Sequence, residues 1–193
     1  MFRDIFSTYT YTGMCNVNLK NFKKHILDTR KKNKEGRKVS NEGGWQSQLF
    51  HEPNKYNKVI FEALNKAAFE IKKTLDLKRN IELSGYWYNI NGKASFNMPH
   101  THSGNYTVIS GVMYIKAPKD SGKIVFQKLD AVSGMMYDYG RVTDFNKYTS
   151  SNFEVVPKEQ LFVLFPASLY HYVQPNKTNN ERISMSFNYN YEL

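Results

Sequence analysis

The stretch NMPHTHSGNYTVISGVMYI, residues 97–115, carries most of the sequence information about the fold. From Tyr106 onward it is rich in β-branched and aromatic residues and predicts a strand. His100 and His102 stand two positions apart at the head of this strand-like segment. Because side chains at i and i+2 of a strand point to the same face, both imidazoles can reach one point in space.

A third histidine is predicted to join this pair. His171 lies between the apolar run LFVLFP and the alternating run RISMSFNYNY, so three of the five histidines would converge. Three protein ligands are typical of a mononuclear metal site with open positions. Two alternatives remain open. The HxH pair is an ordinary loop after Pro99, or only one of its histidines binds the metal, with Asn105 or a water nearby.

The bulk properties favour one cytoplasmic domain. A chain of 193 residues is long enough for one sizeable domain and short for two, so a single domain over residues 1–193 is expected. One cysteine, Cys15, excludes an internal disulfide framework and indicates a reducing compartment. Residues 1–15 lack the apolar core of a signal peptide, and no later run approaches membrane-spanning length. No membrane contact is therefore expected.

The positive charge is concentrated near the N-terminus. The formal net charge is +10, and residues 20–38 hold nine Lys or Arg against two acidic residues, which gives that segment +7. Such a run can attract nucleic acid or an acidic partner. A solvated helix end and loop is the more ordinary interpretation, because no aromatic residues are interleaved with the bases as in single-strand binders.

Residues 1–76 are predicted to be mainly helical, after a short strand in FRDIFSTYTY. Asn18 is a candidate cap for a first helix, and Pro53 suits the first turn of a second. The second helix is predicted to be amphipathic and to rest on a sheet. The apolar stripes comprise Leu19, Phe22, Ile26 and Leu27 in the first helix, and Tyr56, Val59, Ile60, Ala63, Leu64, Ala67 and Ile71 in the second.

Residues 77–193 predict a β-rich half. Several β-branched or aromatic runs are separated by Gly, Pro, Asn and Asp, and no useful helical period recurs. Helices followed by many short strands indicate an α+β chain with an antiparallel sandwich or barrel. The runs are IELSGYWYNI, YTVISGVMYIK, KIVFQ, QLFVLF, LYHYV and RISMSFNYNYE.

The last of these runs has one polar face. Arg182 and Ser184 alternate with apolar Ile183 and Met185, and the polar face is expected to line a cavity beside the metal. Trp87 and Asn89 are further candidates for the pocket wall, but their face is not settled by the sequence.

A long segment without clear periodicity, residues 129–152, separates two of the β runs. Loops of this length inside a compact domain are often lids or binding loops. We expect it to close over the substrate, with Arg141 or Tyr139 facing it. The alternative is a surface insertion of two short strands.

The order HxH, SGVMYIKAP with SGKIVF, LFPASLYHYVQPN and RISMSFN resembles the non-haem Fe(II)- and 2-oxoglutarate-dependent oxygenases, within the prolyl-hydroxylase-like superfamily. It is most similar to a small family of that class from marine bacteria and their phages, with a GGWQS segment before the helix. The resemblance runs from about residue 43 to residue 188. It implies a double-stranded β-helix core (jelly-roll or cupin-like) with the N-terminal helices packed on one sheet. It also implies Fe(II), 2-oxoglutarate and O₂ as reactants, with succinate and CO₂ released as the substrate is hydroxylated.

The resemblance also assigns residues. It implies that His100, His102 and His171 hold Fe(II), and that Arg182 pairs with the far carboxylate of 2-oxoglutarate through its planar fork. Ser184 would donate a second hydrogen bond to that carboxylate. Tyr114 stands where relatives of prolyl-hydroxylase type have a tyrosine that contacts the same group.

These assignments have structural alternatives and one departure. The superfamily usually has His-x-Asp or His-x-Glu, so His102 replaces an acidic ligand and removes one negative charge. Arg182 could instead form a structural salt bridge, Ser184 could be a plain strand residue, and Tyr114 could be core.

Two other functions stay open at this point. One is a cupin-like three-histidine metal enzyme that does not use 2-oxoglutarate. The other is a metal-free β-sandwich module that binds nucleic acid through residues 20–38. The substrate, small molecule or macromolecule, is not readable, and the aromatic-rich composition makes a homodimer plausible.

Overall fold

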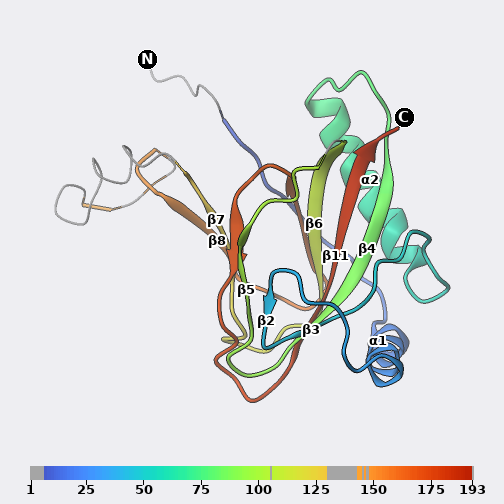
Figure 1. Cartoon of the computed structure of the whole chain (residues 1–193). Coiled ribbons are helices and arrows are strands. Elements are labelled where there is room, and N and C mark those ends of the chain that lie inside the picture. The colour runs from blue at the N-terminus through green and yellow to red at the C-terminus, as the bar shows by residue number, and fades with distance from the viewer. Residues whose placement is uncertain (1–6, 105, 130–142, 145, 147, 193) are drawn as a thin grey trace.

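The computed structural model describes residues 7–104, 106–129, 143–144, 146 and 148–192, and in it two antiparallel β-sheets face each other (Figure 1). The larger sheet has the strand order β1-β9-β6-β11-β4-β3, and the smaller has the order β2-β5-β10-β7-β8. Both helices cover the outer face of the larger sheet (Figure 1). The α+β sandwich that the sequence predicts is confirmed.

The elements have the following bounds. The larger sheet comprises β1 Tyr11–Met14, β3 Trp45–Gln46, β4 Ile81–Asn91, β6 Thr107–Lys116, β9 Leu161–Pro166 and β11 Arg182–Tyr191. The smaller sheet comprises β2 Asn41–Glu42, β5 Phe96–His100, β7 Ile124–Gln127, β8 Asn152–Val155 and β10 His171–Val173. The helices are α1 Lys20–Lys32 and α2 Lys58–Thr74.

The main core lies between the helices and the larger sheet. Helix α2 buries one apolar stripe, and the ring of its Phe61 lies 5.0 Å from that of Tyr86 and 6.3 Å from that of Phe187. Helix α1 presents Phe22 to Tyr88, with ring centroids 5.6 Å apart. The buried stripe of α2 consists of Ile60, Phe61, Leu64, Ala67, Ala68 and Ile71.

The starts of the two helices differ in how well the sequence predicts them. The prediction that Asn18 caps α1 is wrong by one residue, because Leu19 occupies the N-cap and its side chain makes no capping hydrogen bond. The Asn18 side chain instead accepts a hydrogen bond from the Lys20 N–H at 3.0 Å, in the turn just before the helix. The prediction that Pro53 opens α2 is wrong, because the helix begins only at Lys58. The Asn57 side chain accepts the Asn54 N–H at 2.7 Å and so holds the preceding residues in a turn.

Strand β11 confirms the predicted alternation. Ile183 and Met185 are buried on the helix side of the larger sheet. Arg182 and Ser184 line a cavity on the inner side, between the two sheets. The larger sheet thus has an apolar face toward the helices and, at these residues, a polar face toward the cavity.

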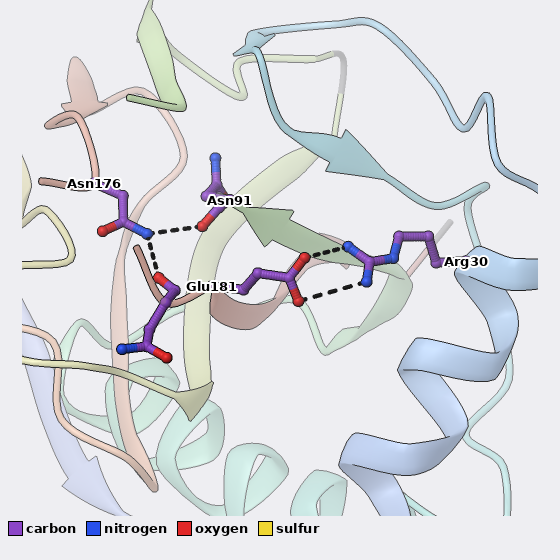
Figure 2. A network of polar contacts seen from close by, with 5 residues as sticks. Arg30, Asn91, Asn176 and Glu181 are labelled. Atoms are coloured by element: carbon purple, nitrogen blue, oxygen red, sulfur yellow. Dashed lines mark hydrogen bonds and ion pairs between the residues drawn. The ribbon is translucent and has the colours of Figure 1, made fainter. Parts of the chain in front are cut away.

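The basic segment of residues 20–38 forms the whole of α1 and the loop after it. Most of its bases are exposed, which agrees with the solvated interpretation. Arg30 differs, because its guanidinium lies 2.6 Å from the Glu181 carboxylate (Figure 2). This ion pair ties α1 to the residue that directly precedes Arg182.

The loop between β10 and β11 is held by a buried asparagine. The Asn176 Nδ2 donates to the Asn91 carbonyl at 2.9 Å and to the Asn180 carbonyl at 2.7 Å (Figure 2). Asn176 is fully buried. Together with the Arg30–Glu181 pair, these bonds position the backbone from which Arg182 enters the cavity.

The predicted lid falls mostly outside the described residues, which omit residues 130–142, 145 and 147, and therefore Arg141 and Tyr139. The two ends of the segment meet where Gln127 of β7 pairs with Asn152 of β8. Within the part of the chain that the structure describes, no helix is both long and apolar enough to cross a membrane.

Candidate active site

Three imidazoles converge on the inner face of the smaller sheet. His171, the first residue of β10, pairs directly with His100, the last of β5. His102 lies two residues beyond β5, where its backbone N–H donates to the Ala167 carbonyl at 2.8 Å. The ring centroids lie 4.5 to 5.2 Å apart. One ligand nitrogen from each ring lies within 4.8 Å of the other two, so the three residues can hold one metal ion.

Backbone carbonyls set the tautomers of two of these rings. The His100 Nδ1 lies 2.6 Å from the Met98 carbonyl, and the His171 Nδ1 lies 2.8 Å from the Leu169 carbonyl. A carbonyl only accepts hydrogen bonds, so each Nδ1 carries the proton and donates it. Each Nε2 therefore keeps a free lone pair, which is the arrangement typical of metal-binding histidines.

Burial keeps the cluster uncharged. Desolvation, together with the smaller effect of the neighbouring rings of His171 and His100, lowers the pKa of His102 to about 3. Desolvation likewise lowers the pKa of His171 to about 4, against its hydrogen bond to Leu169. The pKa of His100 is lowered by the same cause. At neutral pH no proton has to leave before these nitrogens coordinate a cation.

A cavity of about 530 Å³ separates the histidines from the larger sheet. Its walls include His100 and His171 on one side, with Ser184 and Tyr114 on the other. The Trp87 ring is tilted against that of His102, with centroids 5.6 Å apart. The residues predicted to hold the metal and the cosubstrate all line this cavity, and none of its described lining residues is acidic. They are His100, His102, His171, Tyr114, Arg182 and Ser184.

Arg182 is a buried cation with no acidic partner among the described residues. It is 2% exposed and donates to the backbone carbonyls of Ser121 and Gly122. No described carboxylate lies within ion-pair distance of its guanidinium. Desolvation lowers the pKa of Arg182, and the nearby Tyr114 opposes that shift. The alternative of a structural salt bridge thus finds no partner in the described chain, and the cavity offers the guanidinium space for an anion.

Four polar side chains form a row across the cavity face of the larger sheet. Tyr114 of β6 pairs in register with Ser184 of β11. Ser184 pairs with Asn89 of β4, and Asn89 pairs with Gln46 of β3. Burial raises the pKa of Tyr114 to about 12, so its hydroxyl is a neutral donor at pH 7. Gln46 was missed from the sequence because a strand of two residues shows no period.

The structure brings together the three histidines of the predicted ligand set. All three histidine rings reach one point, whereas Asn105 lies outside the described residues. Trp87 and Asn89, whose face the sequence left open, both line the cavity.

Gly122 leads to a testable prediction. Its φ is +93°, and a Cβ there would lie 2.1 Å from the Gln174 carbonyl oxygen and 2.8 Å from the Arg182 Nη1. We expect Gly122→Ala to lower the free energy of unfolding by about 1–3 kcal/mol, because the backbone is strained and the guanidinium is displaced. Thermal unfolding measures the effect.

The matched control for this change is Gly92→Ala. A Cβ at Gly92 would meet nothing closer than the Ser95 Oγ at 4.0 Å. Equal unfolding temperatures for the two variants would contradict the predicted strain at Gly122.

A family model described as "Putative 2OG-Fe(II) oxygenase" matches residues 85–188, more than half of the chain. The chain belongs to this 2OG-Fe(II) oxygenase family. The oxygenase is therefore an oxidoreductase of the dioxygenase class, with Fe(II) and 2-oxoglutarate as its cofactors and O₂ as a reactant. This decides among the three functions that the sequence left open. No curated protein matches the chain.

Solved structures confirm the double-stranded β-helix fold. A prolyl-4-hydroxylase from Pseudomonas putida has a TM-score of 0.64 at 14% identity, over 95% of the oxygenase and 93% of that chain. The collagen prolyl hydroxylase of Paramecium Bursaria Chlorella virus-1, solved with 2-oxoglutarate, has a TM-score of 0.60 at 13% identity, over 95% of the oxygenase and 97% of that chain. A Trichoplax adhaerens prolyl hydroxylase in complex with a hypoxia inducible factor peptide has a TM-score of 0.61 at 9% identity, over 94% of the oxygenase and 83% of that chain.

Proposed function

We propose that the oxygenase binds Fe(II) through His100, His102 and His171, and binds the far carboxylate of 2-oxoglutarate at Arg182. One observation supports this most strongly: three neutral imidazoles face, across one cavity, a buried guanidinium that no described carboxylate pairs with. The ordinary reaction of this family then follows. Bound Fe(II) and 2-oxoglutarate would allow O₂ to oxidise a C–H bond of the substrate, while 2-oxoglutarate is converted to succinate and CO₂.

The histidines act in this scheme as preorganised ligands. The Met98 and Leu169 carbonyls hold the His100 and His171 rings with their Nε2 atoms unprotonated. Three protein ligands would leave positions on the metal open for the cosubstrate and O₂. With His102 in place of an acidic residue, the ligand set adds no negative charge. We therefore expect the centre to favour anionic partners more than a centre with a carboxylate ligand does.

Arg182, Ser184 and Tyr114 act as the carboxylate pocket. A planar guanidinium pairs bidentately with a carboxylate, and its burial keeps water from competing. The Tyr114 and Ser184 hydroxyls have no side-chain hydrogen bonds to other described residues, so they are available as donors. Occupation by a dicarboxylate would compensate a cation that is otherwise buried alone.

The test is an anaerobic titration followed in the visible spectrum. We expect a weak charge-transfer band that requires both Fe(II) and 2-oxoglutarate. The matched probe is 2-oxopentanoate, which has the same chain length and keto acid but no far carboxylate. The concentration of 2-oxopentanoate that gives half-saturation should be at least about 30-fold higher than that of 2-oxoglutarate, because 2-oxopentanoate cannot form the buried ion pair. Equal half-saturation, or no band with iron bound, would contradict the proposal.

The substrate itself is proposed only as a class of molecule with an accessible C–H bond. The Trichoplax relative binds a peptide, so peptides belong in the first pool to be screened. Succinate release measures turnover without knowledge of the product, and each pool should be compared with the enzyme's release of succinate in buffer alone.

A further inference from the structure

Asn89 holds a buried polar atom that no described residue satisfies. The residue is 6% exposed and lines the cavity. Its Nδ2 donates to the Ser186 Oγ at 3.0 Å, while its Oδ1 has no hydrogen-bond partner in the described chain. Buried carbonyl oxygens are nearly always paired, because an unpaired one costs free energy. A ligand that donates a hydrogen bond would satisfy this atom.

Gln46 adds a second carboxamide beside the first. It pairs in register with Asn89, is 5% exposed and lines the same cavity. Among the described residues, no hydrogen bond reaches its side chain. Its backbone carbonyl accepts the Arg37 N–H at 2.8 Å, and the Arg37 side chain also lines the cavity. The two carboxamides therefore stand side by side on the edge strand and its neighbour.

The cosubstrate cannot be the partner of Asn89 Oδ1. At neutral pH 2-oxoglutarate is a dianion whose oxygens only accept hydrogen bonds, and a carboxamide oxygen also only accepts. Its proposed anchors Ser184 and Tyr114 lie on β11 and β6, whereas Asn89 lies on the other side of β11, toward the edge strand β3. An N–H or O–H from a different molecule is required.

The position of Asn89 fits a molecule that also reaches the histidines. Asn89 and Trp87 stand two residues apart on the cavity face of β4, which separates them by about 7 Å along the strand. The Trp87 ring lies against that of His102. A group bound at Asn89 is thus only a few bonds from the histidine cluster. None of the described lining residues is acidic, so a cationic group would be buried there without a counter-charge. The site therefore favours an uncharged group.

We infer that Asn89 and Gln46 form the substrate subsite of the oxygenase, and that they take an uncharged hydrogen-bond donor, an amide N–H or a hydroxyl. The donor stands a few bonds from the C–H that is oxidised. This inference rests on the proposed function of the histidine cluster and of Arg182. It narrows the substrates to amides and alcohols, in small molecules or as part of larger ones.

Two probes of nearly the same shape test the subsite. N-Methylacetamide donates one hydrogen bond through its N–H, whereas methyl acetate donates none. The enzyme is loaded with Mn(II) and 2-oxoglutarate, and proton relaxation of each probe's acetyl methyl group by the metal gives its dissociation constant. We expect N-methylacetamide to bind about three- to tenfold more tightly than methyl acetate, the effect of one additional hydrogen bond. Asn89→Leu should remove this preference, and Gln46→Leu should reduce it.

A control and a second readout separate the possible failures. Asn97→Leu changes a carboxamide that lines the same cavity but already donates to the Ser40 Oγ at 3.3 Å, so it should keep the preference. The Fe(II)–2-oxoglutarate band should be unchanged in Asn89→Leu and Gln46→Leu. Loss of the band in these variants would make the two residues cosubstrate ligands and overturn the inference.

The wild-type enzyme distinguishes the remaining outcomes. Equal binding of both probes, with the band intact, would mean that water alone satisfies Asn89, and the subsite would be wrong while the proposed function stood. Absence of the band in the wild type would instead refute the proposed function. If Asn89→Leu does not fold, as judged by circular dichroism, Gln46→Leu carries the test.

Discussion

Replacement of Arg182 by methionine is expected to weaken 2-oxoglutarate binding by about two to three orders of magnitude. The guanidinium is 2% exposed, and the other described arginine that lines the cavity, Arg37, is exposed to solvent. Without Arg182, the far carboxylate of the cosubstrate would be desolvated and unpaired, which is the larger part of the penalty. The anaerobic charge-transfer titration measures the loss.

Unfolding experiments give the same prediction a second readout. In the wild type, 2-oxoglutarate at 100 times its dissociation constant should stabilise the metal-loaded protein by about 2.7 kcal/mol. Arg182→Met should lose this ligand-dependent stabilisation. Without cosubstrate, its stability should change much less, because the substitution removes a buried charge that has no acidic partner in the described part of the chain.

Arg182→Lys is the matched variant for this prediction. It keeps the charge but loses the planar fork, so 2-oxoglutarate affinity should fall between those of the wild type and Arg182→Met. An Arg182→Met protein that binds 2-oxoglutarate as tightly as the wild type would assign the arginine a purely structural role.

The second large effect is expected at the metal ligands. His171→Gln should lower Fe(II) affinity by about 100-fold or more, because loss of a direct ligand exceeds the usual effect of losing a supporting hydrogen bond. Glutamine fills most of the imidazole volume, which limits damage to the packing around a residue that is 3% exposed. Anaerobic equilibrium dialysis against Fe(II) measures the affinity.

His102→Asp tests the departure from the usual ligand set in the opposite direction. It introduces the carboxylate of the common two-histidine triad, so Fe(II) should still bind, and more tightly than to His102→Ala. His51→Ala is the control, since that exposed ring contacts the Ser84 carbonyl and lies outside the cluster. If His102→Ala binds Fe(II) like the wild type, His102 is not a ligand.

The sequence determined those features of the oxygenase that depend on local geometry. Residues two apart on a strand share a face, and this was sufficient to place Arg182 and Ser184 on the cavity side of β11. The same rule predicted that His100 and His102 would lie together at the head of a strand, which is wrong in its reason. His100 ends β5 and His102 lies two residues beyond that strand, held there by the hydrogen bond from its backbone N–H to the Ala167 carbonyl. The helix stripe of α2 followed from its period, although its start at Lys58 was missed because two asparagine side chains hold a turn after Pro53.

Only the tertiary structure decided which side chains the cavity leaves without partners. Strand β4 has aromatic and polar residues on both faces, so nothing in its alternation indicated which side Asn89 would take. Gln46 belongs to a two-residue strand whose face is set by pairing with β4. The isolation of Arg182 and of the Asn89 Oδ1 depends on every described residue around them. Such isolation is a property of packing between distant segments, which no local pattern encodes.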